Sequence, residues 1–118
     1  MKDLVVIIPA YNEEEIIGYV VNDWHSKLTS LKINFKLVIY DDGSHDNTYS
    51  VIQKVAKEHV DIVAETKKNS GHGPTILKGY KHYIDNAKWI FQVDADNEMS
   101  AEYFNLLWDK RDEFDFLI

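Results

Sequence analysis

The chain has 118 residues, of which 45% are hydrophobic and 28% are charged, a balance typical of a folded globular protein. This length is sufficient for one domain with its own core, so folding requires neither a disulfide nor a structural metal. The chain contains no cysteine, which excludes disulfides, thiolate metal sites and cysteine nucleophiles. The formal net charge is −7 and no basic stripe is present, which argues against a nucleic-acid partner.

The sequence carries no membrane or secretion signal. No apolar stretch approaches the roughly 20 residues that span a membrane. The apolar run near the N-terminus is too short, and wrongly flanked, for a signal peptide. The absence of cysteine fits a reducing compartment, and we therefore expect a cytoplasmic location.

Apolar runs alternate with amphipathic runs along the chain, and this alternation predicts strands separated by helices. The expected strands are residues 4–8, 37–40, 60–64, 89–93 and 114–118. The expected helices are residues 12–28, 51–56, 74–84 and 101–108. Strands that are apolar throughout are typical of a parallel sheet covered on both faces. The sequence therefore predicts an α/β fold, with a mainly parallel sheet and helices on both faces, in a single domain spanning residues 1–118.

Local signals refine the helix boundaries. Asn12 stands three residues before Glu15 and can cap the first helix. Asp46 or Asn47 can cap the second helix, and Pro74 suits the first turn of the third. The expected inner face of the third helix carries Ile76, Leu77, Tyr80, Tyr83 and Ile84.

The most polar motifs follow three of the expected strands. PAYNEE follows the first strand, DDGSHDNT the second and DADNE the fourth. Ligands of parallel α/β sheets bind outside the carboxyl ends of the strands. We therefore expect the three motifs to face one crevice.

The DADNE motif crowds Asp94, Asp96 and Glu98 together after a buried strand. Like charges at this spacing raise one another's pKa, so a cation would stabilise them. Carboxylate oxygens are the ligands that Mg²⁺ and Mn²⁺ prefer, and these ions commonly share a site with phosphates. A solvated acidic turn is the alternative for any isolated D-x-D. The position after a buried strand, beside two other polar motifs, favours the metal.

Two further loops have a structural and a functional interpretation. Asp41 and Asp42 open a tight turn. Their carboxylates either stabilise the turn itself or accept hydrogen bonds from the base or ribose of a ligand. Gly71 and Gly73 lie at the start of a helix, where backbone amides can approach an anion. A flexible loop explains these glycines equally well. His72 is interpreted as a loop residue, and the histidines that show no metal-ligand spacing are interpreted as surface or packing residues: His25, His45, His59 and His82.

Taken in order, VVIIPAYNEE, VIYDDGSHDNT, NSGHGP and QVDADNE closely resemble the family 2 glycosyltransferases of the Rossmann-like GT-A fold. The resemblance covers essentially the whole chain, and DADNE is most similar to the D-A-D-x-Q stretch of the dolichyl-phosphate mannosyltransferase branch. It implies that this part of the chain binds a UDP- or GDP-linked sugar with Mg²⁺ or Mn²⁺. The acceptor it implies is a polyprenyl phosphate or a glycan, and the longer enzyme is then expected at the inner membrane surface.

The resemblance also implies roles for individual residues. The nucleotide base and ribose would be contacted by Pro9, Ala10, Tyr11, Glu13, Asp42 and Asp41. Asp94 would lie near the ribose or metal, Asp96 would be the principal metal ligand, and Glu98, where glutamine is usual, would be a third ligand or alter selectivity. The implied reaction is a single displacement with inversion, in which the metal stabilises the departing nucleoside diphosphate.

The final segment, 114–118, reads as an unfinished strand, so we expect a longer enzyme that supplies the general base and the acceptor site. This chain alone is then expected to bind the donor without turnover, and its final strand could mediate self-association.

A non-catalytic nucleotide-binding module is the alternative. A receiver-type signalling domain has a similar length and acidity, but its acidic pair follows the first strand, where this chain has Pro-Ala-Tyr-Asn.

Overall fold

The computed structural model describes residues 1–95 and 101–113, and a parallel sheet forms the centre of this described part. Its strands are β1 (Lys2–Ala10), β2 (Phe35–Asp41), β3 (Ile62–Thr66) and β4 (Ala87–Gln92). The helices are α1 (Ile17–Ser30), α2 (Thr48–Glu58), α3 (His72–Tyr83) and α4 (Phe104–Asp109), with 3-10 turns at Ala101–Tyr103 and Arg111–Glu113. The strand order is β3-β2-β1-β4, and each pair is parallel. The expected α/β fold is therefore confirmed.

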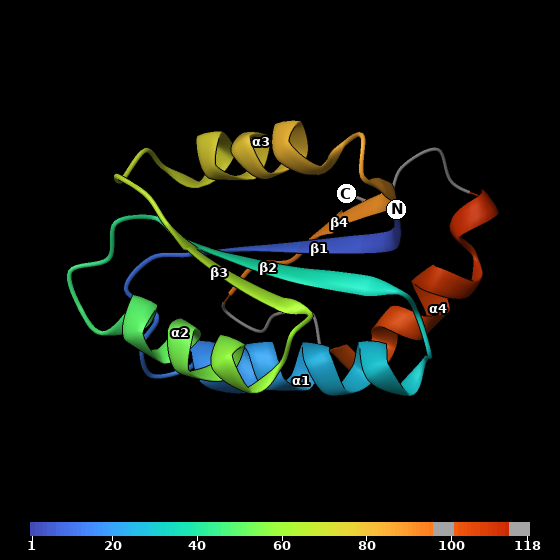
Figure 1. Ribbon diagram of the computed structural model, residues 1–118, viewed down its shortest axis with the longest axis horizontal. Coiled ribbons are helices and arrows are strands. Elements are labelled where there is room, and N and C mark those ends of the chain that lie inside the picture. The colour runs from blue at the N-terminus through green and yellow to red at the C-terminus, as the bar shows by residue number, and fades with distance from the viewer. Residues whose placement is uncertain (96–100, 114–118) are drawn as a thin grey trace.

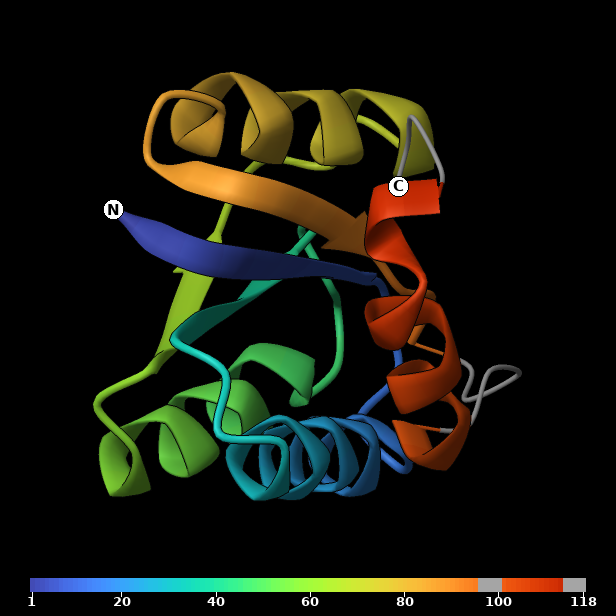
Figure 2. The same ribbon diagram turned by 90° about the vertical axis from the view of Figure 1, so that its right-hand side faces the viewer.

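The sheet lies between two helical layers (Figures 1 and 2). Helices α1 and α2 cover one face, and α3 covers the other. The larger core lies under α1 and α2 and contains the fully buried Trp24, whose ring packs against Phe91 and Phe104. The smaller core, under α3, consists of Val5, Ile7, Val38, Tyr40 and Tyr83. Helices on both faces explain why the strands contain so few polar residues.

Strand β1 occupies the middle of the sheet because it is apolar on both faces. Residues 4–8 are fully buried, and alternate side chains enter the two cores. The strand continues through Pro9, where the sequence predicts its end. Ile7 accepts a hydrogen bond from the N–H of Val93 at 2.9 Å, and the pairing with β4 stops there. Pro9 lies beyond this last bond, so its missing N–H costs no hydrogen bond to β4.

The order of the strands creates a crevice at one edge of the sheet. The chain passes from β3 through α3 to β4, which lies on the opposite side of β1 from β2 and β3. The strand order therefore reverses between β1 and β4, and α/β sheets bind ligands at such a switch point. Gly79 lets α3 pack closely on the sheet, since a Cβ atom at this position would lie only 2.7 Å from Cδ1 of Ile7.

Two element boundaries differ from the sequence prediction. Asn12 does not cap α1, which begins at Ile17; Asn12 has φ 54° and belongs to the preceding turn. Strand β3 begins at Ile62 rather than at Val60, which is fully exposed. The N–H of Ile62 bonds the carbonyl of His59, so a turn occupies the β-branched positions that suggested an earlier start.

The buried face of α3 also differs from the prediction. Leu77 and Ile84 were expected inside but are 53% and 61% exposed. Tyr83 is buried as expected, and the other buried residues of the helix are Thr75 and Gly79. The three buried residues follow an i, i+4, i+8 pattern. Two of them are small, so a search for large apolar residues finds only Tyr83 among them. Close helix–sheet packing rather than hydrophobicity determines which side of α3 is inside.

The remaining boundaries agree more closely. Helix α2 carries the expected apolar face, and Asp46 Oδ1 accepts a hydrogen bond from the N–H of Thr48, the first helical residue, at 2.9 Å. Asn47, the other candidate cap, makes no side-chain capping bond. The expected strand at 114–118 lies outside the described residues. Among the helices that are described, none is long and apolar enough to cross a membrane.

Candidate functional site

An open pocket of about 240 Å³ lies at the carboxyl ends of β1 and β4, at the switch point of the sheet. This edge is on the left in Figure 1, where the strands end and α3 begins. The pocket is lined by Pro9, Ala10, Tyr11, Glu13, Asp42, His72, Asp94 and Ala95. The structure therefore brings the three polar motifs of the sequence to one crevice, together with the start of α3.

The loops after β1 and β2 are tied to each other by hydrogen bonds. The N–H of Asn12 donates to Ser44 Oγ at 2.9 Å, and Asn12 Oδ1 accepts from the N–H of His45 at 2.9 Å. The N–H of Glu13 donates to Thr48 Oγ1 at 2.8 Å. Asn12 thus bridges two loops instead of capping a helix. These bonds hold the PAYNEE segment against the DDGS turn and fix one wall of the pocket.

The carboxylate of Asp41 is used within the fold. Asp41 is 3% exposed and does not line the pocket. Its Oδ1 accepts the N–H of Ser44 at 3.2 Å, which closes the turn, and its Oδ2 accepts the hydroxyl of Thr66 at 2.8 Å. Both oxygens therefore have protein partners. The hydrogen bonds of Asp41 to Ser44 and Thr66 explain why an aspartate stands at this position, and no ligand is needed to explain it.

The carboxylate of Asp42 lines the pocket and organises the loop that leads into α3. Its Oδ1 accepts Lys67 Nζ at 2.6 Å and the N–H of Ser70 at 2.9 Å, and its Oδ2 accepts the N–H of Gly71 at 2.9 Å. Burial on its own would raise the pKa of Asp42, but the bonds from Lys67, Ser70 and Gly71 outweigh burial and lower it. Asp42 is therefore an ionised anchor at the pocket wall.

The start of α3 points toward the end of β4. Gly71 precedes the helix with φ 99°, a conformation that glycine adopts without strain, and its carbonyl accepts the N–H and hydroxyl of Thr75. His72 Nε2 lies 3.2 Å from Oδ1 of Asp94, and about half of each side chain is exposed. A Cβ atom on Gly73 would meet no atom within 4 Å, so packing does not explain that glycine.

Asp94 is the candidate metal ligand that the structure describes. Its side chain is 46% exposed at the pocket, and its Oδ1 also accepts a hydrogen bond from Gln92 Nε2 at 3.3 Å. An accessible carboxylate beside a pocket suits a hard divalent cation. Asp96 and Glu98, the other two expected ligands, lie outside the described residues. The described part of the donor set is therefore compatible with Mg²⁺ or Mn²⁺.

Sequence reasoning overlooked two residues of this site. Lys67 was not singled out, although it is the cation that holds Asp42; a lysine shortly after the strand that pairs with β2 is a weak signal for this contact. His72 was interpreted as a loop residue but lines the pocket opposite Asp94. Its position at the start of a helix that crosses to the switch point could have identified it.

A parallel sheet with a pocket at its switch point defines a Rossmann-like α/β binding domain. The family model of glycosyl transferase family 2 matches residues 5–117. The chain belongs to this family. It is also 33% identical, over 97 residues, to the uncharacterized protein MJ0544 of Methanocaldococcus jannaschii, covering 79% of this chain and 40% of that relative.

Solved structures confirm the GT-A form of the fold. TarS of S. aureus, residues 1–349 in complex with UDP-GlcNAc, matches with a TM-score of 0.74 and 26% identity over 94% of this chain and 31% of its own. The mannosyltransferase PcManGT of Pyrobaculum calidifontis, in complex with GDP-Man and Mn²⁺, matches with a TM-score of 0.58 and 22% identity over 70% of this chain and 26% of its own. The present chain thus spans less than half the length of these proteins.

Proposed function

We propose that this chain is the donor-binding part of a glycosyltransferase that transfers a sugar from a nucleoside-diphosphate sugar with inversion. The observation that carries the proposal is the pocket at the switch point, which collects the conspicuous polar motifs of a family 2 sequence. The complexes of TarS with UDP-GlcNAc and of PcManGT with GDP-Man and Mn²⁺ support a nucleotide-sugar ligand. The base and the sugar are left to experiment.

Different residues of the pocket are assigned to different parts of the donor. In this proposal the segment from Pro9 to Glu13 contacts the base and ribose, because it forms one wall and is held by the neighbouring loop. Asp42 keeps the Lys67–Gly71 loop in place and borders the ligand. His72 and the backbone amides at the start of α3 lie where they can donate to phosphate oxygens.

The acidic end of β4 supplies the metal site in this proposal. Asp94 would hold Mg²⁺ or Mn²⁺ together with Asp96 and Glu98. When bound, the cation supplies Lewis-acid stabilisation of the departing diphosphate. A site of this kind also explains how a chain with a net charge of −7 can bind a polyanion. The general base and the acceptor site are assigned to the rest of a longer enzyme, with a polyprenyl phosphate or a glycan as acceptor.

Calorimetric titration with UDP and with GDP, each with and without Mn²⁺, tests the proposal. We expect one nucleotide to bind in the presence of Mn²⁺, and the binding to be lost in Asp94→Ala and Asp96→Ala. Asp85→Ala is the matched control, because Asp85 is exposed in the turn after α3. Failure of both nucleotides to bind the folded chain, or equal binding by the Asp94 and Asp85 variants, would refute the donor site.

A non-catalytic nucleotide-binding module is the second candidate, since it would retain the same pocket. Hydrolysis or transfer of the sugar separates the two candidates. Release of labelled sugar from the preferred nucleotide-sugar, measured on a polypeptide extended to the length of its relatives, is expected for an enzyme. Donor binding without release would favour the module.

A further inference from the structure

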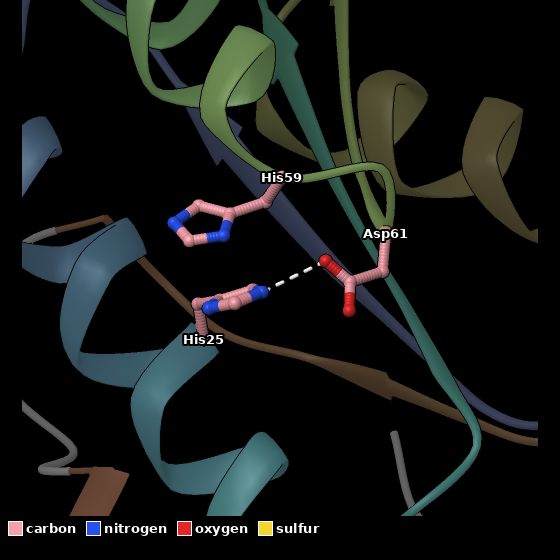
Figure 3. A group of neighbouring side chains, drawn as sticks. All are labelled: His25, His59 and Asp61. Carbon is pink, nitrogen blue, oxygen red and sulfur yellow. Dashed lines mark hydrogen bonds and ion pairs between the residues drawn. The ribbon is translucent and has the colours of Figure 1, made fainter.

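Two histidines and an aspartate form a compact cluster (Figure 3), and none of the three lines the pocket. His25 comes from α1, whereas His59 and Asp61 come from the turn between α2 and β3. Each residue offers one ligand atom, and these atoms all lie within 4.8 Å of one another. The shortest separation is 2.7 Å, between His25 Nε2 and Asp61 Oδ1. His25 is far from His59 and Asp61 in the chain, so the sequence shows no metal-ligand spacing for this group.

The cluster and the pocket lie at opposite edges of the sheet. Asp61 directly precedes β3, so it marks the amino ends of the strands. Asp42 and Asp94 follow β2 and β4, so they mark the carboxyl ends. A cation bound at the cluster would therefore not contact a ligand in the pocket. The two sites can be tested independently.

The backbone that carries the cluster is fixed by hydrogen bonds. The N–H of His59 bonds the carbonyl of Ala56 at the end of α2, and the N–H of Ile62 bonds the carbonyl of His59. The carbonyl of Asp61 accepts the N–H of Leu37 in β2 at 2.9 Å. Two ligands therefore sit on one short turn that is anchored to the sheet. The third is carried by a helix whose neighbouring residue, Trp24, is fully buried.

The side chains are also restrained by packing. The centroids of the His25 and His59 rings lie 3.8 Å apart, with the rings at 32° to each other. The centroids of His25 and Phe35 lie 5.6 Å apart in an edge-to-face arrangement. The side chain of His25 is 13% exposed and that of Asp61 is 30% exposed. Neutral imidazoles and a carboxylate are metal ligands.

The separations in the cluster suit a tetrahedral ion. Ligand atoms about 2.1 Å from zinc lie roughly 3.4 Å from one another. The cluster spans 2.7 Å to at most 4.8 Å, so its separations change by roughly 1.5 Å or less on binding. If His25 binds the metal through Nε2, the imidazole proton must lie on Nδ1. The hydrogen bond between His25 Nε2 and Asp61 Oδ1 is then replaced by one bond from each of these atoms to the metal. Imidazole ligands favour zinc over Mg²⁺ and Mn²⁺, which prefer oxygen.

We propose that His25, His59 and Asp61 bind one Zn²⁺ ion, with water as the fourth ligand. The bound ion joins α1 to the turn between α2 and β3 and stabilises this edge of the sheet. It is a second metal site, chemically distinct from the oxygen site proposed at Asp94. Because metal ligands must be deprotonated, zinc binding at this cluster is expected to weaken in acid.

Calorimetric titration of the chelator-treated chain with ZnCl₂ tests the proposal. We expect one ion to bind and the melting temperature to rise, as it does for any ligand that binds the native state. Co²⁺ in place of Zn²⁺ should give the visible absorption of a tetrahedral site. His59→Ala and Asp61→Asn should each weaken zinc binding at least ~10-fold. Loss of a residue that only hydrogen-bonds a metal ligand already lowers metal affinity by about that factor. Asp61→Asn retains the shape of the side chain and a hydrogen-bond acceptor, which guards against simple unfolding.

Two control variants locate the bound ion. His82→Ala removes an exposed histidine whose described contact is the ring of Tyr83. Asp94→Ala removes the candidate ligand of the pocket. Both are expected to bind zinc as the unmodified chain does. The proposal is overturned if the folded chain binds no zinc, if His59→Ala and Asp61→Asn bind it normally, or if only Asp94→Ala loses it.

Discussion

The ammonium nitrogen of Lys67 lies 2.6 Å from Oδ1 of Asp42, and both side chains are at most 10% exposed. The same carboxylate also accepts the amides of Ser70 and Gly71, at the entrance to α3. One buried ion pair therefore connects the end of β2 to the start of the helix that crosses the sheet. Because Asp42 lines the pocket, the pair links the stability of the fold to the shape of the site.

Replacing Lys67 by methionine tests the structural side of this link. Methionine retains most of the length of the side chain but leaves the buried carboxylate of Asp42 without its cation. We expect a loss of about 2–3 kcal/mol in the free energy of unfolding. The loss is no larger because the hydrogen bonds from the N–H groups of Ser70 and Gly71 to Asp42 remain. Urea denaturation measures this loss. Lys68→Met is the control, because Lys68 is exposed, and the prediction is wrong if the two variants are equally stable.

The lowered pKa of Asp42 predicts how stability depends on pH. Below its ordinary value of 3.8, the unfolded chain binds a proton at this carboxyl more readily than the folded chain does. Asp42 thus contributes stability that is complete above that value and is lost as the pH falls through the folded pKa. The pKa of Asp46 is lowered as well, so Asp42 accounts for only part of the acid dependence.

Asp42→Asn isolates this contribution. Asparagine resembles a protonated aspartic acid, so the variant should be less stable than the unmodified chain near neutral pH. The difference should shrink as the pH falls below 3.8 and through the lowered pKa of Asp42, because the carboxyl then becomes neutral like the asparagine. Unfolding free energies measured across this range give the result. A difference that stays constant or grows in acid would contradict the assigned direction of the pKa shift.

Two glycines of α3 form a matched pair. In Gly79→Ala, the new methyl group would meet Cδ1 of Ile7 at 2.7 Å and the ring of Tyr40 at 3.1 Å. Overpacking should outweigh the gain in helix propensity and cost roughly 1–2 kcal/mol in unfolding free energy. Gly73→Ala meets nothing within 4 Å and should leave stability unchanged or slightly raised. Thermal unfolding of both variants decides whether α3 is packed as tightly as the structure shows.

His72 offers a test of the pocket that does not depend on the acidic residues. If its ring donates a hydrogen bond to a phosphate oxygen, His72→Ala should weaken Mn²⁺-dependent nucleotide binding about tenfold. The His82→Ala variant, on the exposed side of the same helix, should bind normally. Calorimetry with the preferred nucleotide measures both. Equal affinities would place the phosphates away from the start of α3.

The sequence was sufficient to predict the sheet, because continuous apolar runs and amphipathic runs differ in period. It also predicted that the polar motifs meet, since parallel strands end at the same edge. It misplaced the buried face of α3 because Thr75 and Gly79 are small and carry little hydrophobic signal. It misassigned Asn12 because a residue suited to capping is equally suited to a turn.

Contacts between distant residues were beyond the reach of sequence patterns. The Lys67–Asp42 pair depends on how the loop after β3 passes the end of β2. The contact between His25 and Asp61 depends on α1 lying beside the turn that leads into β3. Neither contact leaves a periodic signal along the chain. Both contacts follow from the spatial order of the strands in the sheet, β3-β2-β1-β4, which cannot be read from patterns in a single sequence.

That order has a consequence for the newly synthesised chain. Strand β1 leaves the ribosome before the other strands of the described sheet, yet it pairs with β2 on one side and with β4 on the other. Its partner β4 begins only at Ala87, so the apolar stretch of β1 retains an open edge until most of the chain has emerged. Such unpaired edges are prone to association with other chains. Chaperone dependence during translation should therefore be concentrated in the first strand.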